Sequence, residues 1–440
     1  MSARAATPTP AQESLVAAFA ARPGEPAWLA DARREALGRF ESLGLPTTRH
    51  EDWRFTDLSG LSGQPWVRPG EGGGPWTGAL LPEGPRLVFV NGRLRPDLGD
   101  AGGLPAGTIA TGLAEALARH PEEVRAHLGR LARAEDHPFV AANTALFEDG
   151  AFVRLPPGAG PDLSIALVFL SDPGAAPAAA FPRVLLVAGA GARASVAEVF
   201  VGRGGPAYLT GAVTEIVLGE GAVVEHVRLQ AEALQAYHVG VVCAESAARA
   251  SLTAHAFTLG GALSRSELRA RLAGEGGSVA ANGLYLADGT RRVDNFSWVE
   301  HAVPHCTTSE TYKGILDGHS RAVFAGRIVV KPGAQKTNAY QMNSNLLLSE
   351  DAVVDTKPQL EIFADDVKCG HGGTVGQLDE AALFYLRSRG VREEEARGLL
   401  MWAFASEMVG RVGPAPLRAR ARQLVAARLP SGARLVEAMA

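Results

Sequence analysis

The chain has 440 residues, of which 46% are hydrophobic and 20% are charged, and its formal net charge is −4. This composition is that of an ordinary globular protein with a large core, which argues against disorder. The slightly acidic balance does not favour nucleic acid, because binding to it normally requires a concentrated basic surface. No apolar run approaches the ~18 residues of a transmembrane helix, so we expect no membrane span.

The cysteines and the N-terminus indicate the compartment. The chain has three cysteines, Cys243, Cys306 and Cys369. An odd and sparse set does not form a disulfide framework, which favours a reducing compartment. Residues 1–13 contain no apolar stretch of the kind that a secretory signal has. The sequence therefore predicts a soluble, cytoplasmic protein.

Residues 1–160 have a mixed pattern, and we expect them to form an N-terminal region with both helices and strands. In chain order the patterns predict short helices, a glycine-rich loop, a strand closed by an Asn-Gly turn and a further helix. These elements are expected over 11–44, 65–85, 86–92 and 108–133, respectively.

Residues 161–373 consist largely of short β-type segments that follow glycine or acidic turns. The starts of the clearest segments fall about 26 to 31 residues apart, with one gap near 44, which is the range of fixed-period solenoids. These segments are 192–199, 222–229, 248–255, 277–284, 321–328 and 352–359. A short repeat without a helix buries its apolar face only by stacking on its neighbours, which favours a parallel β-helix. A β-sandwich with Greek-key turns stays open as the alternative.

Residues 374–440 return to helical patterns and are expected to form a C-terminal helical domain. A first helix over 380–389 has Asp379 as a candidate N-cap and Gly390 as its stop. A second helix over 393–409 carries an apolar stripe, and an arginine-rich helix follows.

No nucleotide site is indicated. The turn at Gly189-Ala-Gly191 resembles a dinucleotide-binding loop, but a strand pattern follows it where such a site needs a helix. We therefore interpret it as a tight turn between coils of the solenoid. The chain also has no GxxxxGK[ST] phosphate-binding loop and no GxSxG nucleophile elbow.

The stretch with the clearest metal chemistry contains Cys369 and His371. In an extended strand these two residues point to the same face, where a thiolate and an imidazole can hold one soft or borderline metal ion. Two ligands are too few for a closed tetrahedral site, so a partner chain would have to complete it. A buried thiol beside a hydrogen-bonded histidine is the alternative.

Other candidate residues are weaker. His301, His305 and Cys306 are interpreted as surface or turn residues, and Cys243 as a core residue of a strand. The carboxylate pairs Glu220/Glu225 and Asp365/Asp366 leave a carbohydrate-active β-helix open as a hypothesis, although aromatic residues are only 6% of the chain.

Several long segments resemble the SufD family of iron–sulfur cluster assembly (SUF) proteins. They are 49–56, 139–147, 293–301, 320–326, 341–348, 354–376 and 383–390. The resemblance implies a mainly β protein: a right-handed parallel β-helix between N- and C-terminal helical regions. It also implies a complex with the paralogue SufB and the ATPase SufC. Unlike SufB, which carries a sulfur-accepting cysteine shortly before its Thr-x-Pro turn, this chain has Ala352-Val-Val there.

The resemblance implies a role for each candidate site. The family's functional Cys-x-His maps onto Cys369 and His371, near the SufB–SufD interface, and points to transient iron or a cluster shared with that partner. The family's docking region for SufC maps onto apolar residues of the C-terminal helices: Leu383, Phe384, Tyr385, Leu386, Leu399, Leu400 and Phe404. The expected function is that of a non-catalytic scaffold subunit of the SufBCD complex, without a nucleotide site of its own. An iron-binding homodimer of the isolated chain remains the alternative.

Overall fold

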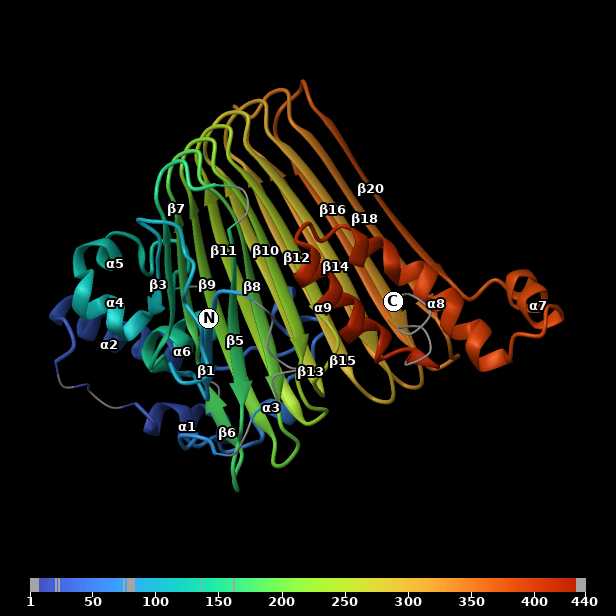
Figure 1. Ribbon diagram of the computed structural model, residues 1–440, viewed down its shortest axis with the longest axis horizontal. Coiled ribbons are helices and arrows are strands. Elements are labelled where there is room, and N and C mark those ends of the chain that lie inside the picture. The colour runs from blue at the N-terminus through green and yellow to red at the C-terminus, as the bar shows by residue number, and fades with distance from the viewer. Residues whose placement is uncertain are drawn as a thin grey trace, which may run out of the picture.

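The computed structural model describes residues 8–19, 22, 24–73, 76, 84–135, 137–160 and 163–432. Two long sheets lie face to face across one interior (Figure 1). The β20 sheet contains, in spatial order, β2 (Arg93–Leu94), β1 (Arg86–Val90), β5 (Ser164–Ser171), β8 (Arg193–Gly202), β10 (Val223–Ala231), β12 (Ser251–Thr258), β14 (Ser278–Ala287), β16 (Thr307–Leu316), β18 (Asn338–Leu347) and β20 (Lys368–Gly376).

The β19 sheet is built in the same way. It contains, in spatial order, β19 (Val353–Ile362), β17 (Arg321–Val330), β15 (Arg292–His301), β13 (Leu263–Leu272), β11 (Ala236–Ser246), β9 (Tyr208–Leu218), β7 (Arg183–Ala188), β4 (Gly150–Leu155) and β3 (Ile109–Gly112), with β6 (Ala178–Ala180) paired to β9.

From β8 onward the chain alternates between the sheets, and each strand pairs in parallel with the strand two positions later. Ser251 lies beside Ser278, and Ser278 lies beside Thr307. This parallel stacking confirms the predicted β-helix and excludes the Greek-key sandwich, whose neighbouring strands would be antiparallel.

The predicted series of segments crosses from one sheet to the other. The first four segments correspond to β8, β10, β12 and β14 of the β20 sheet, whereas the last two correspond to β17 and β19 of the β19 sheet. The gap near 44 residues arises at that crossing, where the series omits β16. It is not an irregularity of the coil, because β16 pairs with β14 in an uninterrupted register.

Alternating side chains build the interior. On β8, Ala194 and Val196 belong to the central cluster between the sheets, whereas Ala197 and Val199 pack outward against the C-terminal helices. Glycine permits the tight turns between coils, as at Gly191, whose φ is 66°. Residues 189–191 thus form the predicted turn, between β7 and β8.

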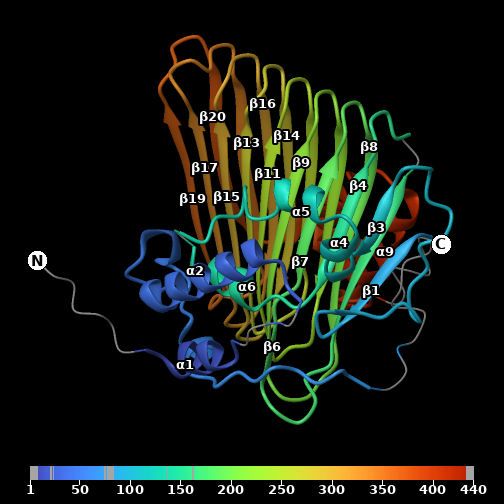
Figure 2. The same cartoon turned by 90° about the vertical axis from the view of Figure 1, so that its left-hand side faces the viewer.

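N-terminal helices cover the outer face of the β19 sheet (Figure 2). They are α1 (Pro10–Ala17), α2 (Ala27–Leu43), η1 (Glu51–Trp53), α3 (Ser59–Ser62), α4 (Leu113–Arg119), α5 (Pro121–His127) and α6 (Pro138–Leu146). The predicted continuous helix over 108–133 is wrong. Its first residues form β3, which pairs with β4, and Pro121 starts a second helix because its ring cannot continue the first.

The C-terminal helices are α7 (Glu380–Ser388), α8 (Glu393–Gly410) and α9 (Ala415–Ala426), close to the predicted bounds. The Asp379 carboxylate accepts hydrogen bonds from the first backbone N–H groups of α7, as expected for an N-cap. Met401, Met408 and Leu417 pack on the outer face of the β20 sheet, while α7 projects beyond it (Figure 1). No helix in the described residues is long and apolar enough to cross a membrane.

Some strands of the sheets come from the predicted N-terminal region: β1 belongs to the β20 sheet, and β3 and β4 belong to the β19 sheet. The predicted divisions into 1–160, 161–373 and 374–440 stay predictions.

Candidate functional site

The C-terminal end of the solenoid is open. Strand β20 ends one sheet and pairs only with β18, and β19 ends the other sheet and pairs only with β17, among the described residues. Each therefore presents a row of backbone N–H and C=O groups without a strand partner, which is a template for another chain. We call these two strand edges and the side chains around them the open end.

Cys369 and His371 lie on β20, at the open end, and the register fixes their direction. Cys369 is the partner of Ala339 and His371 is the partner of Gln341. Ala339 and Gln341 are both buried in the solenoid, and parallel partners in register share a face. Cys369 and His371 therefore share one face, as the sequence predicts, and that face is the interior side of the last coil.

The two side chains differ in burial. Cys369 is half-buried and packs against a small cluster that includes Ile328 and Val330, whereas His371 is exposed because no further coil covers it. Burial raises the pKa of the Cys369 thiol, so the thiol stays protonated until a cation or a base favours the thiolate.

The described residues contain no cluster of three or more His, Cys, Asp or Glu side chains placed to hold a metal ion. Cys369 and His371 thus supply two candidate ligands, and a closed site needs more. Their role as metal ligands stays a prediction.

Exposed apolar side chains surround the open end. They are Tyr340, Met342, Ile362, Phe363 and Val375, which are between 41% and 59% exposed. A group of this kind beside two unpaired strand edges is typical of a protein–protein contact.

Directly below the open end lies a carboxyl group that the sequence did not single out. Glu310, on β16, is buried in the interior and accepts hydrogen bonds from Ser297 Oγ and Gln341 Nε2. Burial raises its pKa to about 7, although these two hydrogen bonds act in the opposite direction. Its charge therefore changes close to neutral pH.

Glu310 gives a testable pH dependence. Because its pKa is higher in the folded chain than the ordinary value of 4.5, the stabilisation from proton binding is complete at low pH and is lost as the pH rises through about 7. Glu310→Gln should flatten the fall in stability between pH 5 and pH 8, by an amount of up to about 3 kcal/mol. Urea unfolding at pH 5, 6, 7 and 8 measures it, with the exposed Glu220→Gln as control. Equal pH profiles for Glu310→Gln and the unmutated chain would contradict the prediction.

The structure corrects the interpretation of His301, which is fully buried at the end of β15 and is neither a surface nor a turn residue. Cys306 lies in the predicted turn, between β15 and β16, although its side chain is buried. The His301 ring lies 2.8 Å from Thr308 Oγ1, and burial lowers its pKa to about 4, so the ring is neutral at physiological pH. Only His305 of that group is exposed. Cys243 is a core residue as predicted, and burial raises its pKa to about 12.

The predicted docking residues fall into two groups. Phe384 and Tyr385 on α7 are 75% and 57% exposed, and Leu399 on α8 is exposed as well. Leu383 is buried, Phe404 packs with the core under α8, and the rest of the set, Leu386 and Leu400, is half-buried. Phe384, Tyr385 and Leu399 are thus the residues that a partner can reach.

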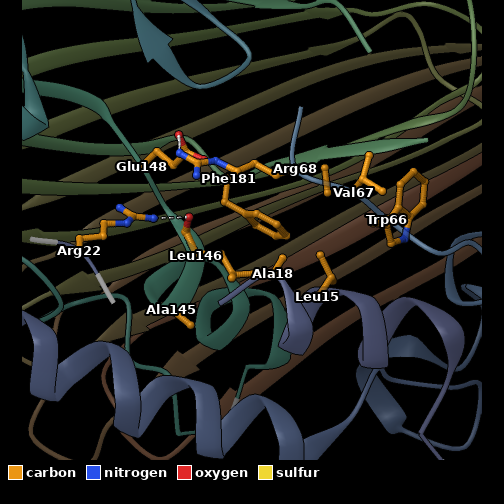
Figure 3. Close-up of a pocket in the computed structure, with 11 residues that line it drawn as sticks. Leu15, Ala18, Arg22, Trp66, Val67, Arg68, Ala145, Leu146, Glu148 and Phe181 are labelled. Atoms are coloured by element: carbon orange, nitrogen blue, oxygen red, sulfur yellow. Dashed lines mark hydrogen bonds and ion pairs between the residues drawn. The ribbon is translucent and has the colours of Figure 1, made fainter. Parts of the chain in front are cut away.

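A cavity of about 340 Å³ lies beside the first coils, between α1, α6 and the segment after β6 (Figure 3). Figure 3 shows its charged side chains already engaged: Arg68 faces Glu148 at 2.8 Å, and Arg22 donates to the Leu146 carbonyl at 2.9 Å. The cavity has few remaining polar groups to orient a ligand, and it lies far along the solenoid from the open end.

Comparison with known proteins agrees with the architecture. Residues 169–404 match the family described as "SUF system FeS cluster assembly, SufBD core domain", and residues 84–167 match the SufBD N-terminal region. The chain is 34% identical to an iron–sulfur cluster assembly SufBD family protein of Synechocystis, over 91% of each chain. It is also 34% identical to the iron–sulfur cluster assembly protein SufD of Escherichia coli, over 91% of this chain and 93% of that one. The SufD of Bacillus subtilis is 25% identical over 94% of this chain. The chain therefore belongs to the SufBD family of iron–sulfur cluster assembly proteins.

Proposed function

We propose that this chain is a non-catalytic scaffold subunit of a cytoplasmic SufBCD-type complex. Iron would bind, and a nascent cluster would form, at the interface between its open end and a SufB-type paralogue, which we call the seam. A role in iron–sulfur cluster assembly follows from family membership. The finer assignment, to a scaffold with these partners, is the proposal.

The observation that carries the proposal is the position of Cys369 and His371 on an uncapped last coil. Two unpaired strand edges and exposed apolar side chains offer a partner a large contact there. A paralogous β-helix is a fitting partner, because its own last strands can continue both sheets across the seam. Such a partner also brings the further ligands that a two-residue site lacks.

The chemistry suits assembly and transfer. Imidazole and thiolate are both ligands for iron, and a cluster that has to be handed on should be held by few, exchangeable ligands. We infer that His371 offers a neutral imidazole to incoming iron and that the partner supplies the sulfide-carrying thiolate. The chain itself would then bind and position, without turnover.

A SufC-type ATPase is the second proposed partner. The chain has no Walker-type sequence, so nucleotide-driven movement would have to come from another subunit. Phe384 and Tyr385 offer exposed aromatic anchors on α7, which projects away from the solenoid. Movement of a bound ATPase would be transmitted through α7 to the seam, because α7 directly follows β20 in the chain.

A homodimer of the isolated chain is the second candidate. The same observation favours it, since an open strand edge can also pair with a second copy of itself. In a homodimer the seam would hold two Cys369 and two His371 side chains, and the isolated chain would bind iron.

Co-purification of the tagged chain from its host tests the proposal. A paralogous β-helix protein and an ATPase should be retained, and the complex should reconstitute a cluster. In the double variant Phe384→Ala/Tyr385→Ala the amount of co-purified ATPase should fall at least tenfold, while the paralogue is retained. Removal of two aromatic anchors costs several kcal/mol of binding free energy. Leu234→Ala, an exposed residue on a distant turn, should change neither. Recovery of the chain alone, as an iron-binding dimer, would favour the homodimer instead.

A further inference from the structure

Three consecutive coils of the β20 sheet place Glu310, Gln341 and His371 in one column. Glu310 on β16 is the register partner of Gln341 on β18, and Gln341 is the register partner of His371 on β20. All three side chains project toward the interior, and neighbouring strands lie about 4.8 Å apart. The column thus runs from a buried carboxyl group to the exposed imidazole at the open end.

The lower half of the column is a formed hydrogen bond. Gln341 Nε2 donates to Glu310 Oε2, and Ser297 Oγ donates to the same oxygen at 2.9 Å, from the opposite sheet. Because the amide nitrogen is engaged by Glu310, the amide group of Gln341 is oriented, with its carbonyl oxygen as the remaining group.

The β19 sheet leaves space for this amide at Gly326. A Cβ atom at Gly326 would lie 2.1 Å from Gln341 Nε2 and 2.7 Å from Gln341 Cδ, so any larger residue would displace the amide from its present position. Gly326 and Gln341 come from two of the segments that resemble the SufD family, and Ser297 comes from a third. These segments are brought together around one side chain.

The carbonyl oxygen of Gln341 has no partner. Gln341 is 2% exposed, and its Oε1 accepts no hydrogen bond from the described residues. A buried acceptor left in this way costs free energy, which a donor in the next coil would recover. The side chain in register on that coil is the imidazole of His371, whose neutral form has one N–H donor.

We propose that Gln341, held by Glu310 and accommodated by Gly326, is a positioning residue for His371. The imidazole does not donate to the Gln341 amide oxygen in the present structure. When the ring turns toward the amide, that oxygen accepts the ring N–H and so directs the other ring nitrogen outward, toward a metal ion at the open end. This inference rests on the proposed function of His371. It extends the site from one exposed strand to a supporting shell in the two coils beneath. Supporting partners of this kind fix the tautomer of a ligating histidine and raise its basicity.

The test measures the ring of His371 directly in the full-length chain. With ¹⁵N-labelled histidine, long-range ¹H–¹⁵N spectra report which ring nitrogen carries the proton, and loss of a signal in His371→Ala assigns it. The unmutated chain should show one dominant tautomer for His371. Gln341→Leu should shift it toward the mixture of a free imidazole. In the co-purified complex, where a partner supplies the further ligands, it should also weaken binding of Co²⁺, used alone as a probe, by about tenfold.

Two further variants guard against a simple folding defect. Gly326→Ala displaces the Gln341 amide without touching His371, and it should reproduce the spectral change. Asn343→Leu removes an equally buried amide from the same strand, whose register partner is Gly373, and should leave the His371 signals unchanged. Unchanged His371 signals in Gln341→Leu, or an equal change in Asn343→Leu, would overturn the inference.

The outcome is separable from that of the proposed function. If Gln341→Leu alters the tautomer while His371→Ala leaves cluster maturation intact, the positioning role of Gln341 is supported and the proposed function is contradicted. If His371→Ala abolishes maturation while Gln341→Leu leaves the tautomer of the His371 ring unaltered, the proposed function is supported and the positioning role of Gln341 is contradicted.

Discussion

His371→Ala is expected to abolish cluster maturation while leaving the partner complex assembled. His371 is exposed on the last strand, so its removal opens no cavity and should change the free energy of unfolding by less than about 0.5 kcal/mol. What is lost is one of the two predicted ligands at the open end, and the described residues contain no cluster of three or more His, Cys, Asp or Glu side chains that could hold the ion instead. Reconstitution with iron and sulfide, followed by the visible absorption of the cluster, measures the effect, which we expect to be at least tenfold.

A matched histidine provides the control. His319 is exposed on a turn, beside Asp351, and does not lie on β20. His319→Ala should mature clusters normally and retain both partners. Normal maturation by His371→Ala, or an equal loss in both variants, would count against an iron-binding role for His371.

Arg265→Leu is expected to cause the largest loss of stability. Arg265 is fully buried on the outer face of β13, where it pairs with Glu267 at 2.6 Å and with Asp294, and its guanidinium lies 3.8 Å from the centre of the Trp53 ring. Burial opposes the ionisation of Glu267, but the charges of Arg265 and His137 hold its pKa well below the usual range. Removal of Arg265 would leave the buried Asp294 without its cation and Glu267 with only His137 and Arg269 as basic partners, at a cost of about 3–5 kcal/mol.

A second arginine of the same strand is the control. Arg271 is half-exposed and pairs with Glu245 and Glu300, so Arg271→Leu should cost about 1 kcal/mol or less. Urea denaturation followed by far-UV circular dichroism compares the two variants at pH 7. Similar unfolding midpoints for both would show that burial of the Arg265 cluster does not control the stability of this region.

The Arg265 cluster also joins distant parts of the chain. Trp53 and Thr56 come from the N-terminal segment that resembles the SufD family, and Thr56 Oγ1 donates to Asp294 on β15. The same segment reaches the last strand of the sheet, where Glu51 pairs with Lys357 on β19. We expect loss of Arg265 to loosen this segment from the solenoid, up to the coil that carries the open end.

Glu310 was missed because β16 and β18 were absent from the predicted series. On these strands the inward residues include Glu310 and Asn343, which weakens the alternation on which strand prediction depends. Polar inward residues alone do not hide a strand. On β10 the inward residues include His226 and Arg228, but its outward residues Val227 and Leu229 are apolar, so apolar and polar residues still alternate.

His301 was misplaced for a related reason. It has the same parity along β15 as Val293 and Val299, which lie in the interior, and this parity predicts an inward side chain. The nearby Pro304 indicates a turn, and residues beside a turn are commonly exposed, so the local pattern favours an exposed histidine. Strand parity alone would have given the correct burial.

By itself the sequence determined the coil period, the glycine turns, the C-terminal helices and the common face of Cys369 and His371, because these depend on residues close together in the chain. The tertiary structure alone decided that the last coil is open, and that Gly326 and Gln341 meet across the interior. It also decided that Trp53 covers Arg265. These contacts join residues on different coils or different sheets, and which of them meet depends on the register and stacking of the whole solenoid.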